Sequence, residues 1–174
     1  MLTGRLPHLA PVVVVVAGID NPNPSTYIFF AQVNEKPPIV GIGIKRKRYT
    51  YDLIKKHHEF SVNFLGSNIL SEVDKAGMMS GHMGNKQEKL AFHYDQGHTI
   101  KTPVIRESIL AYEVKYMDEA AFPDHQWIYG EVTNIRASYD LKDNPQGLKP
   151  VLASFYSLTY HLPGALAGKW GFSR

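Results

Sequence analysis

The sequence of 174 residues contains no cysteine. Disulfide bonds, iron–sulfur clusters, thiolate zinc sites and thiol catalysis are therefore excluded, so any redox chemistry would need a bound cofactor. The patterns GxGxxG, GxxxxGK[ST], HExxH and GxSxG are also missing. Their absence disfavours the doubly wound nucleotide-binding folds and the common metalloprotease and serine-hydrolase sites.

The sequence also lacks a hydrophobic run of the roughly 18 residues that a membrane span requires. The segment LAPVVVVVAGI (9–19) is as long as the apolar part of a signal peptide. Only Arg5 and His8 precede it, however, and Asp20 and Asn21 follow where small residues would mark a cleavage site. Five consecutive valines instead predict a strand that is buried on both faces. We therefore expect a cytoplasmic protein with no membrane contact.

Positive charge is in small excess. The formal net charge is +3, with 44% hydrophobic and 20% charged residues, which is typical of a globular chain. Its length suits a single domain over residues 1–174. A mild excess, despite a pI near 9.0, favours a local anion site over a nucleic-acid-binding surface.

Apolar alternation and turn residues predict many strands and few helices. Helices are expected over 50–58, with Thr50 as N-cap, and over 67–79, capped by Ser67 or Asn68. The fold class that follows is mostly β, a barrel or sandwich with a few short helices. The expected strands cover the valine run, 26–33, 39–44, 59–66, 108–117, 125–138 and 151–160, with a turn region over 141–150.

Two glycines share one face of the strand 39–44. Gly41 and Gly43 alternate with Val40, Ile42 and Ile44, which form the apolar face. A glycine face lets a flat ligand approach, but it also suits a barrel bend that needs small residues. Both interpretations remain open from the sequence.

The most charged stretch, IKRKRYTYDLIKKHH (44–58), places Lys45–Arg48 between a strand and a helix. Guanidinium, hydroxyl and helix N-terminal N–H groups together suit a phosphate. Because successive side chains diverge, only part of the run can face one ligand. Arg48 and Thr50 are the better candidates, and the alternative is a solvated basic cluster.

Eight histidines raise the question of a metal site. His57, His58 and His82 lack the spacing of metal ligands, so no metal site is expected. His125 follows Asp124, a carboxylate that could orient its ring, although a surface histidine in a turn is the alternative. The aromatic residues of the strands are expected mostly in the core, and an OB-like surface that stacks bases is a further alternative.

Several segments together resemble one family, the flavin reductase-like FMN-binding split barrels, which include flavoredoxin-type and ferric-reductase-type proteins. The most specific match is RKRYTYDLIKKHHEFSVNFL, which is similar to the family's R-x-T-x-x-x-I…EF-x-V-N stretch. The other matching segments are PVVVVVAGID, STYIFFAQVNEKPPIVGIGI, SGHMGNKQEKLAF, PDHQWIYGEV and, more loosely, YHLPGALAGKWG. The resemblance covers about residues 9–170.

The resemblance implies a homodimeric Greek-key split barrel with FMN near the dimer interface. It assigns the phosphate to Arg48 and Thr50, the ring and ribityl side to the segment 25–27, and the catalytic role to His125. The full set of cofactor residues it implies is Ser25, Thr26, Tyr27, Asn34, Arg48, Thr50, Ser80 and Lys86. Departures from the family pattern are the proline-rich turn NPNP, Asn85 in place of an acid, and Gln87 in place of an aromatic residue.

The implied function is that of an FMN-binding oxidoreductase, an NAD(P)H-dependent flavin or ferric reductase. NADH or NADPH would be a transient co-substrate, and the electron acceptor a small molecule or a protein. The alternative is a flavoredoxin-like FMN electron carrier that does not itself oxidise NAD(P)H. An OB-like nucleic-acid binder is the third hypothesis, and the resemblance implies no nucleic-acid partner.

Overall fold

The computed structural model describes residues 9–138, 153–155 and 159–161. The expected turn region 141–150 and the tail segment after residue 161 lie outside these ranges. In chain order the elements are β1 (Leu9–Pro11), β2 (Val13–Ala17), β3 (Asn23–Tyr27), β4 (Phe30–Glu35), β5 (Pro38–Ile44), α1 (Tyr49–His57), β6 (Glu59–Phe64), the 3-10 turn η1 (Ser67–Ile69), α2 (Leu70–Met78), the 3-10 turn η2 (Gly81–Met83), β7 (Tyr94–Asp95), β8 (Val104–Ile105), β9 (Leu110–Ala121), β10 (Gln126–Ala137), β11 (Ala153–Phe155) and β12 (Thr159–His161).

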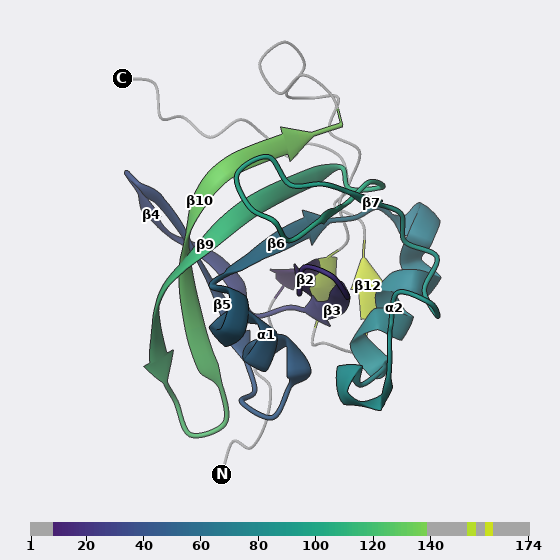
Figure 1. Cartoon of the computed structure of the whole chain (residues 1–174), viewed down its shortest axis with the longest axis horizontal. Helices are drawn as coiled ribbons and strands as arrows, with labels where there is room; N and C mark the ends of the chain where they lie inside the picture. The colour runs from purple at the N-terminus through teal and green to yellow at the C-terminus, as the bar shows by residue number, and fades with distance from the viewer. Residues whose placement is uncertain (1–8, 139–152, 156–158, 162–174) are drawn as a thin grey trace.

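A seven-stranded antiparallel sheet dominates the molecule (Figure 1). Its strand order is β3-β2-β6-β9-β10-β5-β4, so β3 and β4 lie at opposite ends of the order although they follow each other in the chain. The expected strand 26–33 is therefore two strands, separated at Ile28 and Phe29. The Gly43 N–H donates to the Phe29 carbonyl oxygen at 2.8 Å, which continues the pairing of β4 with β5. The two-residue link from β3 to β4 and the contact of β3 with β5 bring the two ends of the sheet together. The sheet thus curves into a barrel.

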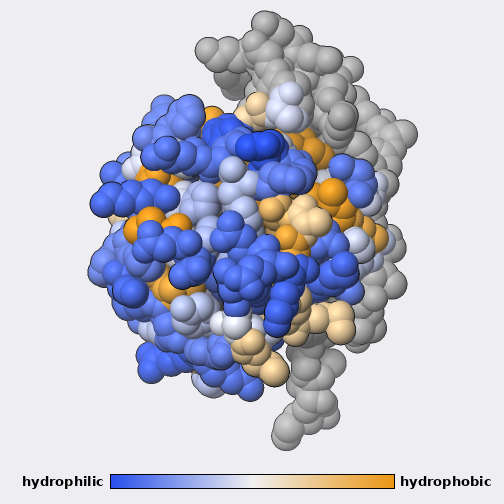
Figure 2. Space-filling view, turned by 45° about the vertical axis from the view of Figure 1, so that its right-hand side comes forward, coloured by the Kyte–Doolittle hydropathy of each residue, from blue (hydrophilic) through white to orange (hydrophobic). Residues whose placement is uncertain are grey.

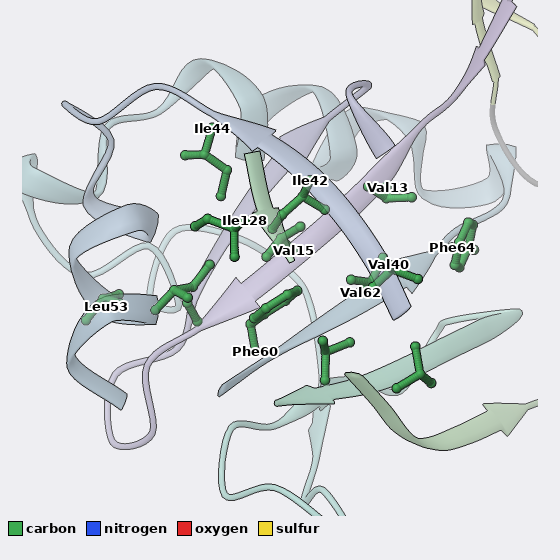
Figure 3. Packing of buried hydrophobic residues seen from close by; sticks show 14 residues of the cluster. Val13, Val15, Val40, Ile42, Ile44, Leu53, Phe60, Val62, Phe64 and Ile128 are labelled. Atoms are coloured by element: carbon green, nitrogen blue, oxygen red, sulfur yellow. The ribbon is translucent and has the colours of Figure 1, made fainter. Parts of the chain in front are cut away.

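The interior of this curved sheet is filled by aliphatic side chains around Phe60 (Figure 3). Val13 and Val15 of β2 point into it and are 0% exposed, while Leu53 and Ile54 of α1 cover its end. The opposite face of β2 is buried as well, because Val14 and Val16, together with the preceding Val12, form a second core cluster with Val73 of α2. The expectation of a valine strand buried on both faces is confirmed.

The glycine face of β5 is occupied by the chain's own aromatic side chains. A Cβ at Gly41 would lie 3.1 Å from the Trp127 ring, and one at Gly43 would lie 2.8 Å from the Cβ of Phe29. The interpretation that these glycines leave room for a flavin is therefore wrong. They make space for cross-strand aromatic rings instead.

The helix starts differ from the expected ones. Helix α1 begins at Tyr49, and Arg48 occupies the N-cap position without a side-chain capping hydrogen bond. Thr50 is 1% exposed and lies inside the first turn, so its hydroxyl does not cap the helix. Helix α2 begins at Leu70 after the 3-10 turn, and Ile69, not Ser67 or Asn68, precedes it. Both cap predictions are wrong, although both helices exist.

The α2 side of the molecule presents a mixed surface (Figure 2). Hydrophobic residues on that face lie in small patches separated by hydrophilic ones. In the part of the chain that the structure describes, no helix is both long and apolar enough to cross a membrane.

Candidate functional site

A cleft of about 380 Å³ opens at the N-terminal end of α1. Three segments meet there: the connection from β2 to β3, the first residue of α1, and the loop that follows α2. Helix N-terminal N–H groups are natural anion donors because the first turn leaves them without helical partners. The lining residues are Asn21, Pro22, Asn23, Tyr49, Gly81, His82, Gly84, Asn85 and Lys86.

Asn23 and Thr50 form a buried polar pair beside the cleft. The Asn23 Nδ2 donates to Thr50 Oγ1 at 2.9 Å, and the two residues are 4% and 1% exposed. The other amide atom, Asn23 Oδ1, is buried and has no hydrogen-bond partner among the described residues. This oxygen faces Gly81, where an added Cβ would collide with it. The glycine therefore lets the loop after α2 approach the asparagine closely.

Lys86 is a buried cation that also lines the cleft. It is 2% exposed, and its ammonium donates to the carbonyl oxygens of Pro24 at 2.8 Å and Ala76 at 2.9 Å and to Ser25 Oγ at 3.3 Å. No carboxylate pairs with it among the residues that the structure describes. Burial, helped by the positive charge of Arg48, lowers the pKa of Lys86 to about 8. An anion in the cleft would offset the unfavourable burial of this charge.

Three hydroxyl groups converge on the same face of β3. Ser25 and Tyr27 lie on the same face of the strand as Asn23. The Tyr27 hydroxyl is buried near the hydroxyls of Thr50 and Ser25, without a well-formed hydrogen bond among the described residues. Burial raises the pKa of Tyr27, and its two hydroxyl neighbours and the charge of Arg48 partly oppose this rise. The structure thus brings Ser25, Tyr27, Thr50 and Lys86 together.

Thr26 lies on the opposite face of β3. Its hydroxyl donates to the carbonyl oxygen of Val73 at 2.5 Å, and its side chain packs against Gly77 of α2. The Thr26 side chain therefore ties β3 to α2 behind the cleft, which leaves the backbone as the part of Thr26 available to a cofactor.

The rim of the cleft carries the basic run and the loop 80–83. Arg48 is exposed at the N-cap position of α1, where its charge acts on both Lys86 and Tyr27. Ser80 immediately precedes Gly81, and its carbonyl oxygen accepts from the N–H of Met83 at 3.2 Å. The His82 ring packs on the Tyr49 ring with centroids 5.1 Å apart. His82 thus lines the cleft, and Arg48 and Ser80 directly precede the lining residues Tyr49 and Gly81.

Of the nine residues of the predicted site, only Lys86 is part of the cleft lining, and Asn34 and His125 also lie away from the residues that cluster beside it. Asn34 is exposed on β4, and its Nδ2 donates to the Pro37 carbonyl oxygen at 2.7 Å within the β4–β5 hairpin. His125 lies in the β9–β10 turn with an 18% exposed side chain. Its Nδ1 is 3.0 Å from Asp124 Oδ1, and its ring packs edge-on against Phe29 at 5.0 Å. The hydrogen bond from His125 lowers the pKa of Asp124, so the expected carboxylate partner is confirmed.

Asn23, Tyr49 and Gly81 line the cleft but carried no assigned role from the sequence. The signal for Asn23 was its place in the turn between PVVVVVAGID and STYIFFAQVNEKPPIVGIGI, two segments that resemble the family. Among the described residues, no group of three or more histidine and acidic side chains is arranged to hold a metal ion.

Comparisons with known proteins agree on one family. The model of the flavin reductase-like domain matches residues 4–161. An uncharacterised protein of Archaeoglobus fulgidus is 31% identical over 144 residues, which cover 82% of this chain and 81% of that protein.

Solved structures share the architecture. A flavoredoxin from Methanosarcina acetivorans is 26% identical with a TM-score of 0.83, and the match covers 95% of this chain and 90% of the other. An FMN-binding protein from Thermus thermophilus with bound 1-cyclohex-2-enone has the same fold, with a TM-score of 0.83, 24% identity and coverage of 97% and 98%. The expected mostly β split barrel is confirmed. The chain belongs to the flavin reductase-like domain family.

Proposed function

We propose that this chain binds FMN with its phosphate in the cleft at the N-terminus of α1 and acts as an NADH- or NADPH-dependent reductase. The single observation that carries the proposal is the buried ammonium of Lys86, which lines the cleft and has no carboxylate partner among the described residues. A phosphate monoester carries close to two negative charges at neutral pH and would neutralise both Lys86 and Arg48.

The donors around the cleft suit a phosphate. All three Lys86 protons are engaged by protein oxygens, so this residue supplies charge while Arg48 and the first N–H groups of α1 supply hydrogen bonds. Thr50 Oγ1 already accepts from Asn23, which leaves the hydroxyl proton of Thr50 for the ligand. Asn23 Oδ1 is an acceptor that a ribityl hydroxyl would satisfy. Ser80 would approach the phosphate from the loop that precedes Gly81.

The ring side of FMN is proposed to lie along Ser25, the Thr26 backbone and Tyr27, as the family resemblance implies. His125 is proposed to contact the nicotinamide, where Asp124 orients its ring and Phe29 buries one edge. Asn34 remains a proposed flavin contact, although it lies on β4, away from the cleft lining. A homodimer with FMN near its interface is also proposed from the resemblance.

When bound, FMN supplies hydride acceptance from the nicotinamide and onward electron transfer to a flavin, a ferric complex or a partner protein. The chain's share is to hold the phosphate, orient the ring and position the nicotinamide. The second candidate is an FMN electron carrier without NAD(P)H oxidation, favoured by the likeness to a flavoredoxin at 26% identity.

Titration of the apoprotein with FMN and with riboflavin tests the proposal. Because riboflavin lacks the phosphate, we expect FMN to bind at least about tenfold more tightly, as charge-assisted hydrogen bonds to a phosphate predict. Equal affinities, or no uptake of either flavin, would overturn the proposed site. Anaerobic addition of NADH or NADPH then separates the two candidates. Loss of the flavin absorbance at about 450 nm indicates a reductase, whereas persistence of this absorbance indicates a carrier.

A further inference from the structure

The four cations of the basic run form one tight turn between β5 and α1. The Arg48 N–H donates to the Lys45 carbonyl oxygen at 2.9 Å, which closes the turn, and all four side chains are exposed. The first and last Cα atoms of such a turn lie within about 7 Å of each other. Four like charges in this space repel one another, so the turn favours a bound anion.

Nearby carboxylates are engaged elsewhere. Asp124 pairs with His125, Asp52 lies 4.0 Å from His82, and Glu119 binds Lys55 at 3.3 Å. Within the described ranges none of the four cations of the turn forms an ion pair with a carboxylate. Asp124 lies near enough to Lys45 to offset part of the charge of the turn, whereas Arg46 and Lys47 have no carboxylate partner among the described residues.

The turn connects the two parts of the proposed site. On one side, the Lys47 carbonyl oxygen lies 3.3 Å from Nε2 of His82 at the rim of the cleft. On the other, Arg46 donates to Gln126, the residue after His125, at 3.4 Å. Gln126 also pairs with Ile44, so β10 delivers His125 next to the start of the turn. A nucleotide whose nicotinamide lies at His125 and whose adenosine half folds back over the protein surface would thus reach the turn with its 2′-phosphate.

We propose that Lys45, Arg46 and Lys47 bind the 2′-phosphate of NADPH and thereby select NADPH over NADH. The inference rests on the proposed function, in which Arg48 serves the FMN phosphate and leaves three cations for a second anion. NADH and NADPH share the pyrophosphate, whereas the 2′-phosphate adds close to two further negative charges. Arg46 can bind it with the planar fork of its guanidinium, flanked by two lysine charges.

Anaerobic reduction of the FMN-loaded protein by each nucleotide gives the first test. We expect NADPH to be preferred, and the triple variant Lys45→Ala, Arg46→Ala, Lys47→Ala to lose at least about tenfold of that preference, as loss of charge-assisted bonds predicts. The control is Lys56→Ala, Lys101→Ala, Lys115→Ala, which removes the same charge from exposed positions outside the turn. An unchanged NADPH to NADH ratio in the first variant, or an equal change in the control, overturns the inference.

Direct binding provides a second readout that does not depend on hydride transfer. Adenosine 2′,5′-bisphosphate should bind the FMN-loaded protein more tightly than adenosine 5′-monophosphate, and the turn variant should abolish the difference. If neither nucleotide reduces the flavin but the bisphosphate binds selectively, the inference stands and the reductase proposal fails. Equal binding of the two adenosine compounds, or equal competition by a DNA oligonucleotide, would mean a diffuse positive field and overturn it.

Discussion

The ammonium of Lys86 lies 2.8 Å from the carbonyl oxygen of Pro24, at the floor of the cleft. A second partner, the carbonyl oxygen of Ala76, connects the same ammonium to α2. One buried cation thus joins β3, α2 and the loop after it, and places a positive charge where an anion can approach. Buried charges without a counter-ion are unfavourable in a folded protein, so such an arrangement points to a ligand.

Replacing this cation should separate ligand binding from stability. In Lys86→Met the buried charge is lost, so we expect FMN to bind at least about tenfold more weakly. The melting temperature of the apoprotein should change little, because relief from the desolvation of the ammonium is opposed by the loss of its hydrogen bonds to the carbonyl oxygens of Pro24 and Ala76. Fluorescence titration and thermal melts measure both effects. Lys89→Met, an exposed position in the same loop, is the control and should leave both unchanged.

The pKa of Lys86 makes a second prediction about pH. The pKa of Lys86 is about 8 in the folded protein and about 10.4 in the unfolded chain, so the unfolded chain binds more protons between these pH values. The stability of the apoprotein should therefore rise as the pH increases from about 8 to about 10. Bound phosphate favours the charged ammonium, so FMN binding should take up protons in this range and weaken as pH rises.

Calorimetry in buffers of different ionisation enthalpy measures this proton uptake. The comparison with Lys86→Met isolates the lysine from tyrosines that also titrate at high pH. Proton uptake of the same size in wild type and variant would show that another group is responsible.

The sequence predicted the overall fold better than the boundaries of its individual strands and helices. The run of five valines predicted a strand that is buried on both faces, and the structure confirms this prediction. The break between β3 and β4 could not be predicted, because residues 26–30 are all β-branched or aromatic and the break depends on the curvature that brings β3 to β5 across the barrel. The N-cap of α1 was mispredicted because Thr50 is a good capping residue locally but is buried against Asn23.

The candidate site could be predicted only at residues that belong to a recognisable motif. Arg48 and Thr50 were predicted because a basic residue and a hydroxyl stand at a strand-to-helix junction. The structure places both at the N-terminal end of α1. The clustering of Ser25, Tyr27 and Lys86 depends on contacts between residues about 60 positions apart, such as Lys86 with Ser25, which no local pattern encodes. The role of the glycines of β5 could not be decided from the sequence for the same reason, since their neighbours are Trp127 of β10 and Phe29 between β3 and β4.

The hydroxyl of Thr50 can be removed with little change in volume. In Thr50→Val the ligand loses a donor and the Nδ2 group of Asn23 loses its acceptor. We expect FMN affinity to fall about tenfold and the free energy of unfolding to fall by about 1–2 kcal/mol, since a buried donor is left unsatisfied. Thr50→Ser keeps the hydroxyl and should retain most of the affinity. Equal affinity losses in the two variants would mean that packing of the methyl group matters, not the hydroxyl.

The last prediction concerns the division of labour within the basic turn. Arg48 occupies the N-cap position of α1 and its charge acts on Lys86 and Tyr27, whereas Lys45 stands at the β5 end near Asp124. Arg48→Ala should therefore weaken FMN binding about tenfold or more, because a charge-assisted contact to the phosphate is lost, and Lys45→Ala should change it about twofold at most. Titrations at low and high salt measure both effects. If the two variants lose the same affinity and the loss disappears in high salt, the turn acts on FMN only as a diffuse field and Arg48 is not a phosphate ligand.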